Sequence, residues 1–419
     1  MNNNSTRLSF TGKAAEIKLL LYCARPELDG EGIEQIRPLA MNSVDWDYLL
    51  QTALQHRVMP LVYVNLKKIC PLALPDAAMA RFRKAFLTNA AHNLLFTEEL
   101  FKLLDVLHGH DILAVPIKGP ALAEAIYGSI ALRQFVDLDI LVHRQQALAV
   151  MALLSSTGYL SEVPLDEVQL ERYIRREYSL AMTKNKNTRS PIVEIHWEMT
   201  GRYSSFPFDL HFLKNRLVNA ELEGRKILQP AAEELLVYLC MHAAKNCWDS
   251  LDSICCISGL IHRRPSLDWQ RITLLAEKMR CERILLLNLF LASTLLNASL
   301  PEHIQEKAIK DLSIKKIALD VVRNLFCEND VPSRSAVSSD FSTIHFKVRD
   351  KFTEKIRYVL FLLFCSTRED WRAFPLQARF SSLHFLLRPI RLFLILLTNM
   401  FGRYFSNERE AFAGDKYVD

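Results

Sequence analysis

The chain has 419 residues, half of them apolar and 24% charged, so it can bury two cores or one core with a large helical annex. Basic residues exceed acidic residues by only five, 52 against 47, which is too little to indicate a nucleic-acid partner. Nine cysteines without a C-x-x-C pair argue against a disulfide or zinc framework and favour buried thiols in a reducing compartment. The N-terminus lacks a compact secretion signal, and we therefore expect a cytoplasmic protein.

Residues 1–108 are expected to form a helical N-terminal region whose first twelve residues are disordered. From residue 13 onwards, apolar side chains recur three and four positions apart, which is the period of one face of a helix. Examples are Trp46, Leu49, Leu50 and Ala53, and later Leu94, Leu95, Leu100, Leu103, Leu104 and Leu107.

Residues 109–200 alternate between strand and helix patterns and are expected to form a catalytic module. Its last two strands are joined by the polar segment 184–190, which predicts an antiparallel hairpin. The predicted strands lie near 112–117, 135–142, 158–163, 176–183 and 191–198, and the predicted helices near 120–128, 144–157 and 166–174.

Two aspartates, Asp137 and Asp139, lie inside the apolar strand near 135–142. Alternate side chains of a strand share a face, so the two carboxylates project together about 7 Å apart. Burying two like charges costs several kcal/mol unless a cation compensates them, which points to a shared divalent ion such as Mg²⁺. The alternative is that the two aspartates end the strand and form salt bridges to Arg133 or Arg144.

A third carboxylate is expected from the strand near 191–198, where Glu194, His196 and Glu198 alternate on one face. Glu194 lies in the middle of the strand and is the best placed. Glu198 is near the end, where it is either solvated or shares the role of Glu194. His196 either lines the site or hydrogen-bonds to a neighbour.

The motifs I-K-G-P-A-L-A, Y-G, L-R-Q-F-V-D-L-D-I-L-V and V-E-I-H-W resemble the uncharacterised nucleotidyltransferase family of the polymerase-β-like superfamily. In that superfamily, a Gly-containing turn and a helix precede a D-x-D strand, and a later strand supplies a third acid. The resemblance covers about residues 40–265 and implies an α+β fold, with a mixed sheet and flanking helices embedded between helical N- and C-terminal regions. Further residues that match the family pattern are Asp45 and Trp46, His56 to Val58, His242 to Lys245, Trp248 and Leu251.

The chain departs from these patterns in two places. The usual superfamily turn is Gly followed by Gly or Ser, whereas Lys118, Gly119 and Pro120 stand here, as in this particular family. Cys256 stands where the family tends to place an aspartate, which puts the role of that helix in acceptor binding in doubt.

Nucleotidyl transfer is an in-line displacement at the α-phosphorus of an NTP, in which negative charge builds up on the attacking oxygen and on the leaving pyrophosphate. Two cations about 4 Å apart can stabilise both ends. In this scheme Asp137 and Asp139 share the metals, and Glu194 binds the one that activates the acceptor hydroxyl. These three residues are the predicted catalytic and metal-binding set.

The predicted nucleotide site lies where a strand passes into a helix at Lys118 and Gly119. Backbone N–H groups at a helix N-terminus point towards anions, so this end of the helix can receive the triphosphate. The Lys118 ammonium would add a charge for the β or γ phosphate, or it is a solvated strand end. Arg133 is expected to be a second phosphate contact.

Residues 201–328 are expected to form a helical domain on the substrate and nucleotide side. Its segment 233–247 places His242 and Lys245 three residues apart on one helix face. If that helix crosses the mouth of the site, Lys245 reaches the nucleotide and His242 lines the pocket. The alternative is a buried, satisfied histidine and a surface lysine.

The C-terminal part is expected to comprise a linker (329–342), a helical region (343–404) and a disordered tail (405–419). Its apolar runs, 358–365 and 392–397, fall well short of the ~20 residues of a membrane-spanning helix. We expect these helices to pack on the catalytic module. Peripheral membrane contact through their apolar and basic side chains is the less favoured alternative.

These features predict a Mg²⁺-dependent nucleotidyltransferase, with Mn²⁺ as the alternative ion, that moves an NMP from an NTP to an unknown small-molecule, glycan or peptide acceptor. The resemblance suggests bacterial gene clusters for surface polysaccharides or modified peptides. Two alternatives stay open: a non-catalytic nucleotide-binding or regulatory protein with the same fold, and a phosphotransferase that uses the same metal site. Three convergent carboxylates favour an enzyme, because a scaffold gains nothing from them.

Overall fold

The computed structural model describes residues 13–184, 190–201, 207–326, 343–349, 351–365, 370–371 and 386–394. The chain separates into two compact units, one formed by Met1–Ser161 and Tyr178–Asp350 and the other by Glu162–Glu177 and Lys351–Asp419. The predicted disordered start, the linker and the C-terminal tail lie outside the described residues.

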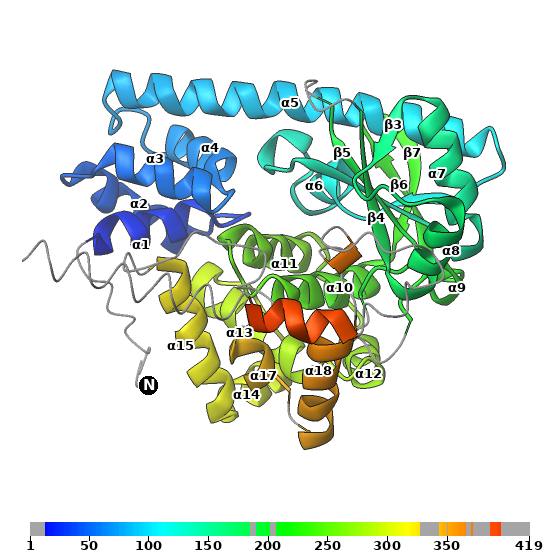
Figure 1. The fold of residues 1–419 in the computed structure, drawn as a ribbon. Coiled ribbons are helices and arrows are strands. Elements are labelled where there is room, and N and C mark those ends of the chain that lie inside the picture. Colours follow the sequence, from blue (N-terminus) through cyan, green and yellow to red (C-terminus); the bar gives the residue numbers. More distant parts are fainter. Residues whose placement is uncertain are drawn as a thin grey trace, which may run out of the picture. The chain divides into compact units, whose positions relative to one another are not determined.

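The first unit begins with five helices, which confirms the helical prediction for this region (Figure 1). In α3 the predicted apolar face is buried at Leu49, Leu50 and Ala53. The 33-residue helix α5 runs from beside α3 and α4 to the sheet. The five helices are α1 (Ala14–Cys23), α2 (Gly30–Met41), α3 (Trp46–Gln55), α4 (Met59–Ile69) and α5 (Asp76–His108).

A five-stranded mixed sheet follows, with the strand order β1-β2-β5-β4-β3. Strands β2 and β5 are parallel, and the other neighbours are antiparallel. The antiparallel pairing of β4 with β5 confirms the predicted hairpin, and the mixed sheet with its flanking helices confirms the α+β fold class. The strands are β1 (Ala114–Pro116), β2 (Asp137–Val142), β3 (Tyr159–Ser161), β4 (Ser179–Lys184) and β5 (Ile192–His196).

Helix α5 fixes the segment that leads into β2. This segment follows α6 (Gly119–Tyr127) and contains the short 3₁₀ helix η1 (Ile130–Leu132). The buried amide of Asn93 on α5 donates hydrogen bonds to the carbonyls of Ile130 and Arg133, at 2.6 and 2.7 Å. Because unpaired buried carbonyls are costly, these bonds hold the approach to β2 in one conformation. On the far side of β2, η2 (Arg144–Gln146) leads into α7 (Ala147–Ser156).

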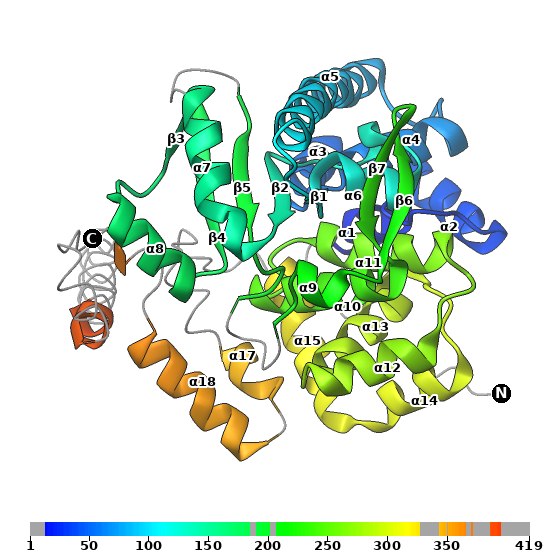
Figure 2. The ribbon, with the colours of Figure 1, turned by 90° about the vertical axis from the view of Figure 1, so that its right-hand side faces the viewer.

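A short helix and a β-hairpin follow β5, in a stretch for which no strand was predicted. They are α9 (Leu210–Leu213), β6 (Leu217–Leu222) and β7 (Arg225–Pro230) (Figure 2). The two turn residues that join β6 to β7, Glu223 and Gly224, have φ values of +46° and +78°, as a two-residue hairpin turn requires. Asn or Asp usually occupies the first of these positions, so a glutamate there hides the hairpin signal in the sequence.

The described residues of the first unit that follow β7 are helical, so the helical prediction for 201–328 holds from Ala232 onwards but not for the hairpin of β6 and β7. Helix α10 is buried along most of its length and packs against α11, α12 and α13. Beyond its C-terminus, the fully buried Trp248 donates a hydrogen bond from Nε1 to Asn288 Oδ1 at 2.8 Å, which anchors the turn into α11. The helices are α10 (Ala232–Lys245), α11 (Leu251–Arg263), α12 (Trp269–Lys278), α13 (Glu282–Leu296), α14 (Glu302–Lys310), α15 (Leu312–Phe326) and α17 (Thr343–Lys347).

The second unit contains α8 (Glu167–Arg176), α18 (Phe352–Phe364) and a helical segment at 386–394. Its buried Arg388 forms an ion pair with Asp370 at 2.5 Å. Among the described residues, no helix is long and apolar enough to cross a bilayer. The packing of these helices on the catalytic module stays a prediction.

Candidate active site

A pocket of about 360 Å³ lies in the first unit, between the polar face of the sheet and helix α10. Asp137 and Glu194 reach it from the sheet, and His242 and Lys245 reach it from α10. The structure thus brings together side chains that are more than 100 residues apart in the sequence. The predicted residues that line the pocket are Lys118, Arg133, Asp137, Glu194, His196, His242 and Lys245.

A cluster of two carboxylates and an imidazole lies on strands β2 and β5. Glu194 and His196 of this cluster line the pocket, whereas Asp139 is buried and is not a lining residue. The parallel register places Asp139 directly beside Glu194. His196, two residues further along β5, has its Nε2 atom 2.9 Å from Asp139 Oδ1 and 3.5 Å from Glu194 Oε2. One ligand atom from each of the three residues lies within 4.8 Å of the others. His196 therefore lines the site and also hydrogen-bonds to a neighbour.

Strand β4 orients the glutamate of this cluster. The Ser179 hydroxyl donates a hydrogen bond to Glu194 Oε1 at 2.7 Å. The antiparallel register pairs Ser179 with His196 and Ala181 with Glu194, so the serine lies on the same face of the sheet as the cluster. This contact could have been inferred from the alternation of residues 177–183 once the hairpin register was known.

The two aspartates and His196 have different electrostatic surroundings. Burial would raise the pKa of Asp139, but the Lys118 ammonium and the hydrogen bond from His196 outweigh it and lower this pKa to about 2. Burial, and then repulsion from Asp139, raise the pKa of Asp137. Burial would lower the pKa of His196, but Glu194 and Asp139 outweigh it and raise this pKa. The site thus favours an ionised Asp139 and disfavours charge on Asp137.

Lys118 is the cation closest to the acid cluster. Helix α6 begins at Gly119, whose φ of +59° favours glycine, and a Cβ added there would lie only 3.3 Å from the Asp137 carbonyl oxygen. This tight turn directs the Lys118 side chain onto Asp139, with Nζ 2.8 Å from Oδ1. The Lys118 side chain is only 11% exposed, so it is not a solvated strand end.

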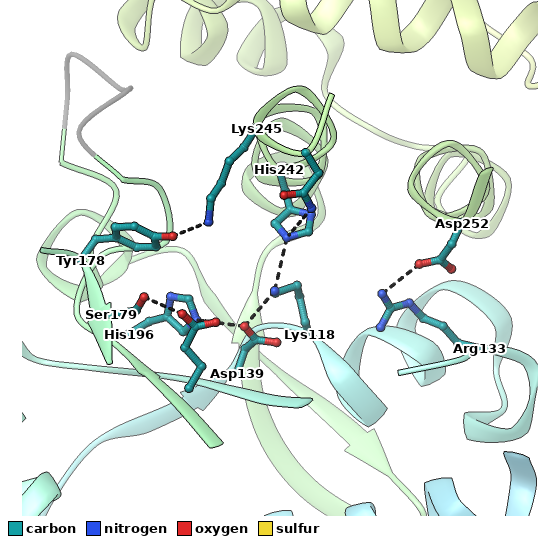
Figure 3. Close-up of polar contacts among 11 residues, drawn as sticks. Lys118, Arg133, Asp139, Tyr178, Ser179, His196, His242, Lys245 and Asp252 are labelled. Carbon is teal, nitrogen blue, oxygen red and sulfur yellow. Dashed lines mark hydrogen bonds and ion pairs between the residues drawn. The ribbon is translucent and has the colours of Figure 1, made fainter. Parts of the chain in front are cut away.

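Two side chains of α10 reach into the pocket from the opposite wall, as Figure 3 shows. His242 Nε2 lies 3.4 Å from Lys118 Nζ, and the Lys245 ammonium contacts the hydroxyl of Tyr178. Burial, followed by the charges of Lys118 and Lys245, lowers the pKa of His242 well below its usual value, so neutral His242 can accept a hydrogen bond from Lys118. Helix α10 therefore does cross the site.

The two arginines that were considered as salt-bridge partners of the aspartates have other partners. Arg133 is buried and pairs with Asp252 of α11 at 3.0 Å, while Arg144 pairs with Glu198. The Glu198 side chain is 16% exposed and does not line the pocket, so it is neither a solvated group nor a neighbour of Glu194 in the site.

Several pocket residues had no role predicted from the sequence. Arg57, from the loop between α3 and α4, is exposed, has a left-handed φ of +60° and lines the pocket. The backbone N–H of Asp252 donates to the His56 carbonyl at 3.1 Å, which ties this loop to α11. Arg57 belongs to the matching piece 56–58, but its sequence context gave it no role. Asp252 does not line the pocket and acts on it through Arg133. Tyr178, Tyr238, Asn246 and Asp249 also line the pocket.

A family model described as uncharacterised nucleotidyltransferase matches residues 42–297, which is more than half of the chain. The chain belongs to this family. The matched region includes every residue that lines the pocket, from Arg57 to Asp249. No curated protein matches the chain.

The family suggests a divalent metal, and the acid cluster fits one. In the described part of the chain, Asp139 Oδ2 is a buried carboxylate oxygen without a hydrogen-bond partner. Such an atom is costly unless something else satisfies it. Carboxylate oxygens suit Mg²⁺ and Mn²⁺, and the adjacent imidazole is compatible with Mn²⁺. The donor set therefore fits a divalent cation without fixing which one.

Proposed function

We propose that this protein is a Mg²⁺- or Mn²⁺-dependent nucleotidyltransferase that transfers an NMP from an NTP to an acceptor of the small-molecule, glycan or peptide class. The observation that carries the proposal is the unpartnered Oδ2 atom of buried Asp139, whose neighbour Glu194 lines a pocket with cationic walls. A purely structural carboxylate would have both oxygens satisfied.

Asp137, Asp139 and Glu194 would hold the metal. When bound there, a divalent ion would supply charge stabilisation for the attacking and leaving oxygens of an in-line displacement. Asp137 is half-buried at the pocket edge, so it is accessible to an ion that also touches substrate. The Ser179 hydroxyl would keep Glu194 in the orientation that metal binding needs.

Basic side chains around the pocket would bind the triphosphate. Lys118 and the first amides of α6, beginning at Gly119, are placed at a helix N-terminus, where backbone dipoles favour anions. Lys245 and Arg57 lie on other walls of the same pocket, so phosphates could be contacted from several sides. Arg133 is also a lining residue, although Asp252 already satisfies part of its guanidinium.

Labelling the donor at two positions tests the proposal. The full chain is incubated with each NTP, labelled at the α or the γ phosphate, together with Mg²⁺ or Mn²⁺ and a fractionated cell extract. Nucleotidyl transfer places the α label in a new product and releases the γ label as pyrophosphate. Transfer of the γ label alone would indicate a phosphotransferase. Binding of NTP with no labelled product in any fraction would favour the non-catalytic alternative.

Glu194→Gln and Glu198→Gln form a matched pair of controls for this experiment. Both changes remove one negative charge, one in the middle of β5 and the other two residues beyond its end, but only Glu194 lines the pocket. A product made by the Glu198→Gln protein and not by the Glu194→Gln protein would assign the activity to this site and not to a contaminant.

A further inference from the structure

The outer face of α5 carries a stripe of exposed leucines. Leu87, Leu94 and Leu95 are 53%, 55% and 56% exposed, whereas Phe82 and Phe96 on the inner face are buried. Single exposed apolar residues are ordinary, but here they recur at the spacing of one helix face over two turns. Such a stripe on a long helix is typical of a helix-pairing surface.

The stripe is self-complementary about Ala91. Three exposed residues before Ala91 each have a complementary exposed residue at the same number of positions after it. A small residue stands at the centre, apolar and neutral residues flank it, and opposite charges stand at the two ends. The pairs are Leu87 with Leu95, Thr88 with Leu94, and Lys84 with Glu98, and all six side chains are exposed.

We propose that two copies of this chain pair in antiparallel fashion through this face of α5, with Ala91 of both copies on the two-fold axis. In that arrangement Leu87 of one copy meets Leu95 of the other, and each Lys84 meets a Glu98, as an isologous interface requires. The alanine at the centre allows the two helices to approach closely. A parallel pairing would instead place like charges together at both ends.

The charged ends are available for this contact. In its own chain Glu98 pairs only with Lys102 among the described residues, at 2.7 Å, and both side chains are more than 60% exposed. Exposed pairs of this kind contribute little to stability, so exchanging the partner costs little. None of the stripe residues lines the active-site pocket, and pairing therefore leaves the pocket open.

The stripe spans residues 84–98, which corresponds to about 22 Å of helix. This length gives an interface at the small end of the specific range, so we expect a dimer that dissociates at micromolar concentrations. The inner face of the same helix holds the carbonyls of Ile130 and Arg133 through Asn93, so a paired α5 would also support the approach to β2.

Analytical ultracentrifugation of the full chain over ~1 to 200 μM tests the proposal, since this range brackets a micromolar Kd. We expect a monomer–dimer equilibrium that Leu95→Glu weakens at least tenfold. Leu274→Glu is the matched control, because Leu274 on α12 is 57% exposed and lies outside the stripe. A wild-type protein that stays monomeric, or a dimer that Leu95→Glu leaves intact, would overturn the proposal.

Charge exchange gives an independent test that leaves the apolar stripe unchanged. Lys84→Glu and Glu98→Lys should each weaken the dimer, and the double variant should restore it. A mixture of the two single variants should form heterodimers in preference to either homodimer, because the opposite charges then meet at both ends. Failure of both the double variant and the mixture to recover association would show that Lys84 and Glu98 do not meet.

If Leu95→Glu lowers the Tm of a monomeric protein, the stripe is covered by the chain itself and the proposal is wrong.

Discussion

The ammonium of Lys118 lies 2.8 Å from Oδ1 of Asp139, and the imidazole of His196 lies 2.9 Å from the same oxygen. Lys118, just before α6, and His196, on strand β5, thus compensate one oxygen of this buried carboxylate, while its second oxygen has no hydrogen-bond partner among the described residues. This arrangement explains how an apolar strand tolerates two aspartates, because a lysine supplies part of the compensation that the sequence led us to expect from a metal alone.

Asparagine substitutions should separate the two aspartates by their effect on stability. Without added metal, Asp137→Asn should leave the Tm unchanged or raise it, because burial and Asp139 already disfavour its charge. Asp139→Asn should lower the free energy of unfolding by about 3 kcal/mol, since it removes the closest partner of a buried lysine. Urea unfolding of both variants in EDTA measures the difference. Equal losses in the two variants would show that the ion pair with Lys118 does not contribute as described.

Lys118→Met should weaken NTP binding by roughly 1 to 3 kcal/mol, the range for a charge-assisted hydrogen bond, and leave NMP binding nearly unchanged. The reason is that the Lys118 charge would act on the β and γ phosphates, which an NMP lacks. Isothermal titration with an NTP and the matching NMP measures both affinities. Parallel losses for the two ligands would instead mean that the variant has disturbed the pocket itself.

Glu194→Gln should reduce turnover at least ~100-fold while NTP binding changes little, because metal-dependent stabilisation of the transition state is lost. Glu198→Gln should have a milder effect, because Glu198 pairs with Arg144 and does not line the pocket. Steady-state rates with the labelled donor provide the measurement. Similar small effects of both substitutions would remove Glu194 from the metal-binding set.

His242 should make the protein less stable as the pH falls. Burial, Lys118, Lys245 and Arg133 lower its pKa and Asp139 raises it, so the net effect keeps the folded imidazole neutral. The unfolded chain binds a proton below about pH 6.5 and the folded chain does not, so stability is lost between that pH and the lower folded pKa.

Replacing this histidine should remove that loss. Between pH 7.5 and 5.5, the free energy of unfolding of His242→Gln should fall by about 1 kcal/mol less than that of the wild type. Urea unfolding at the two pH values measures this, and a change at the exposed His108 is the control. If His242→Gln and His108→Gln behave alike, the burial of His242 has no consequence for proton binding.

The sequence predicted those parts of the site that follow from local periodicity. The alternation within β2 and β5 correctly indicated that both are strands, and the register confirms that Asp139 and Glu194 are neighbours. The turn from strand to helix at Gly119 was also predicted and is confirmed.

Contacts between distant segments could not be predicted. Lys118 and His242 are 124 residues apart, and Arg133 and Asp252 are 119 apart, so no local pattern joins them. The hairpin of β6 and β7 was missed because Glu223 adopts a positive φ that its residue type rarely indicates. The exposure of Leu94 and Leu95 was equally hidden, since their spacing predicts a helix but does not say which face is buried.

Manganese binding tests the central claim, that Asp139 and Glu194 form a divalent-metal site, most directly. Titration of Mn²⁺ into the full chain, followed by loss of the free-ion electron paramagnetic resonance signal, measures affinity without any knowledge of the acceptor. We expect saturable binding by the wild type that Asp139→Asn and Glu194→Gln each weaken at least ~tenfold, with Glu198→Gln unchanged. Equal binding by all four proteins, or no saturable binding by the wild type, would contradict the account.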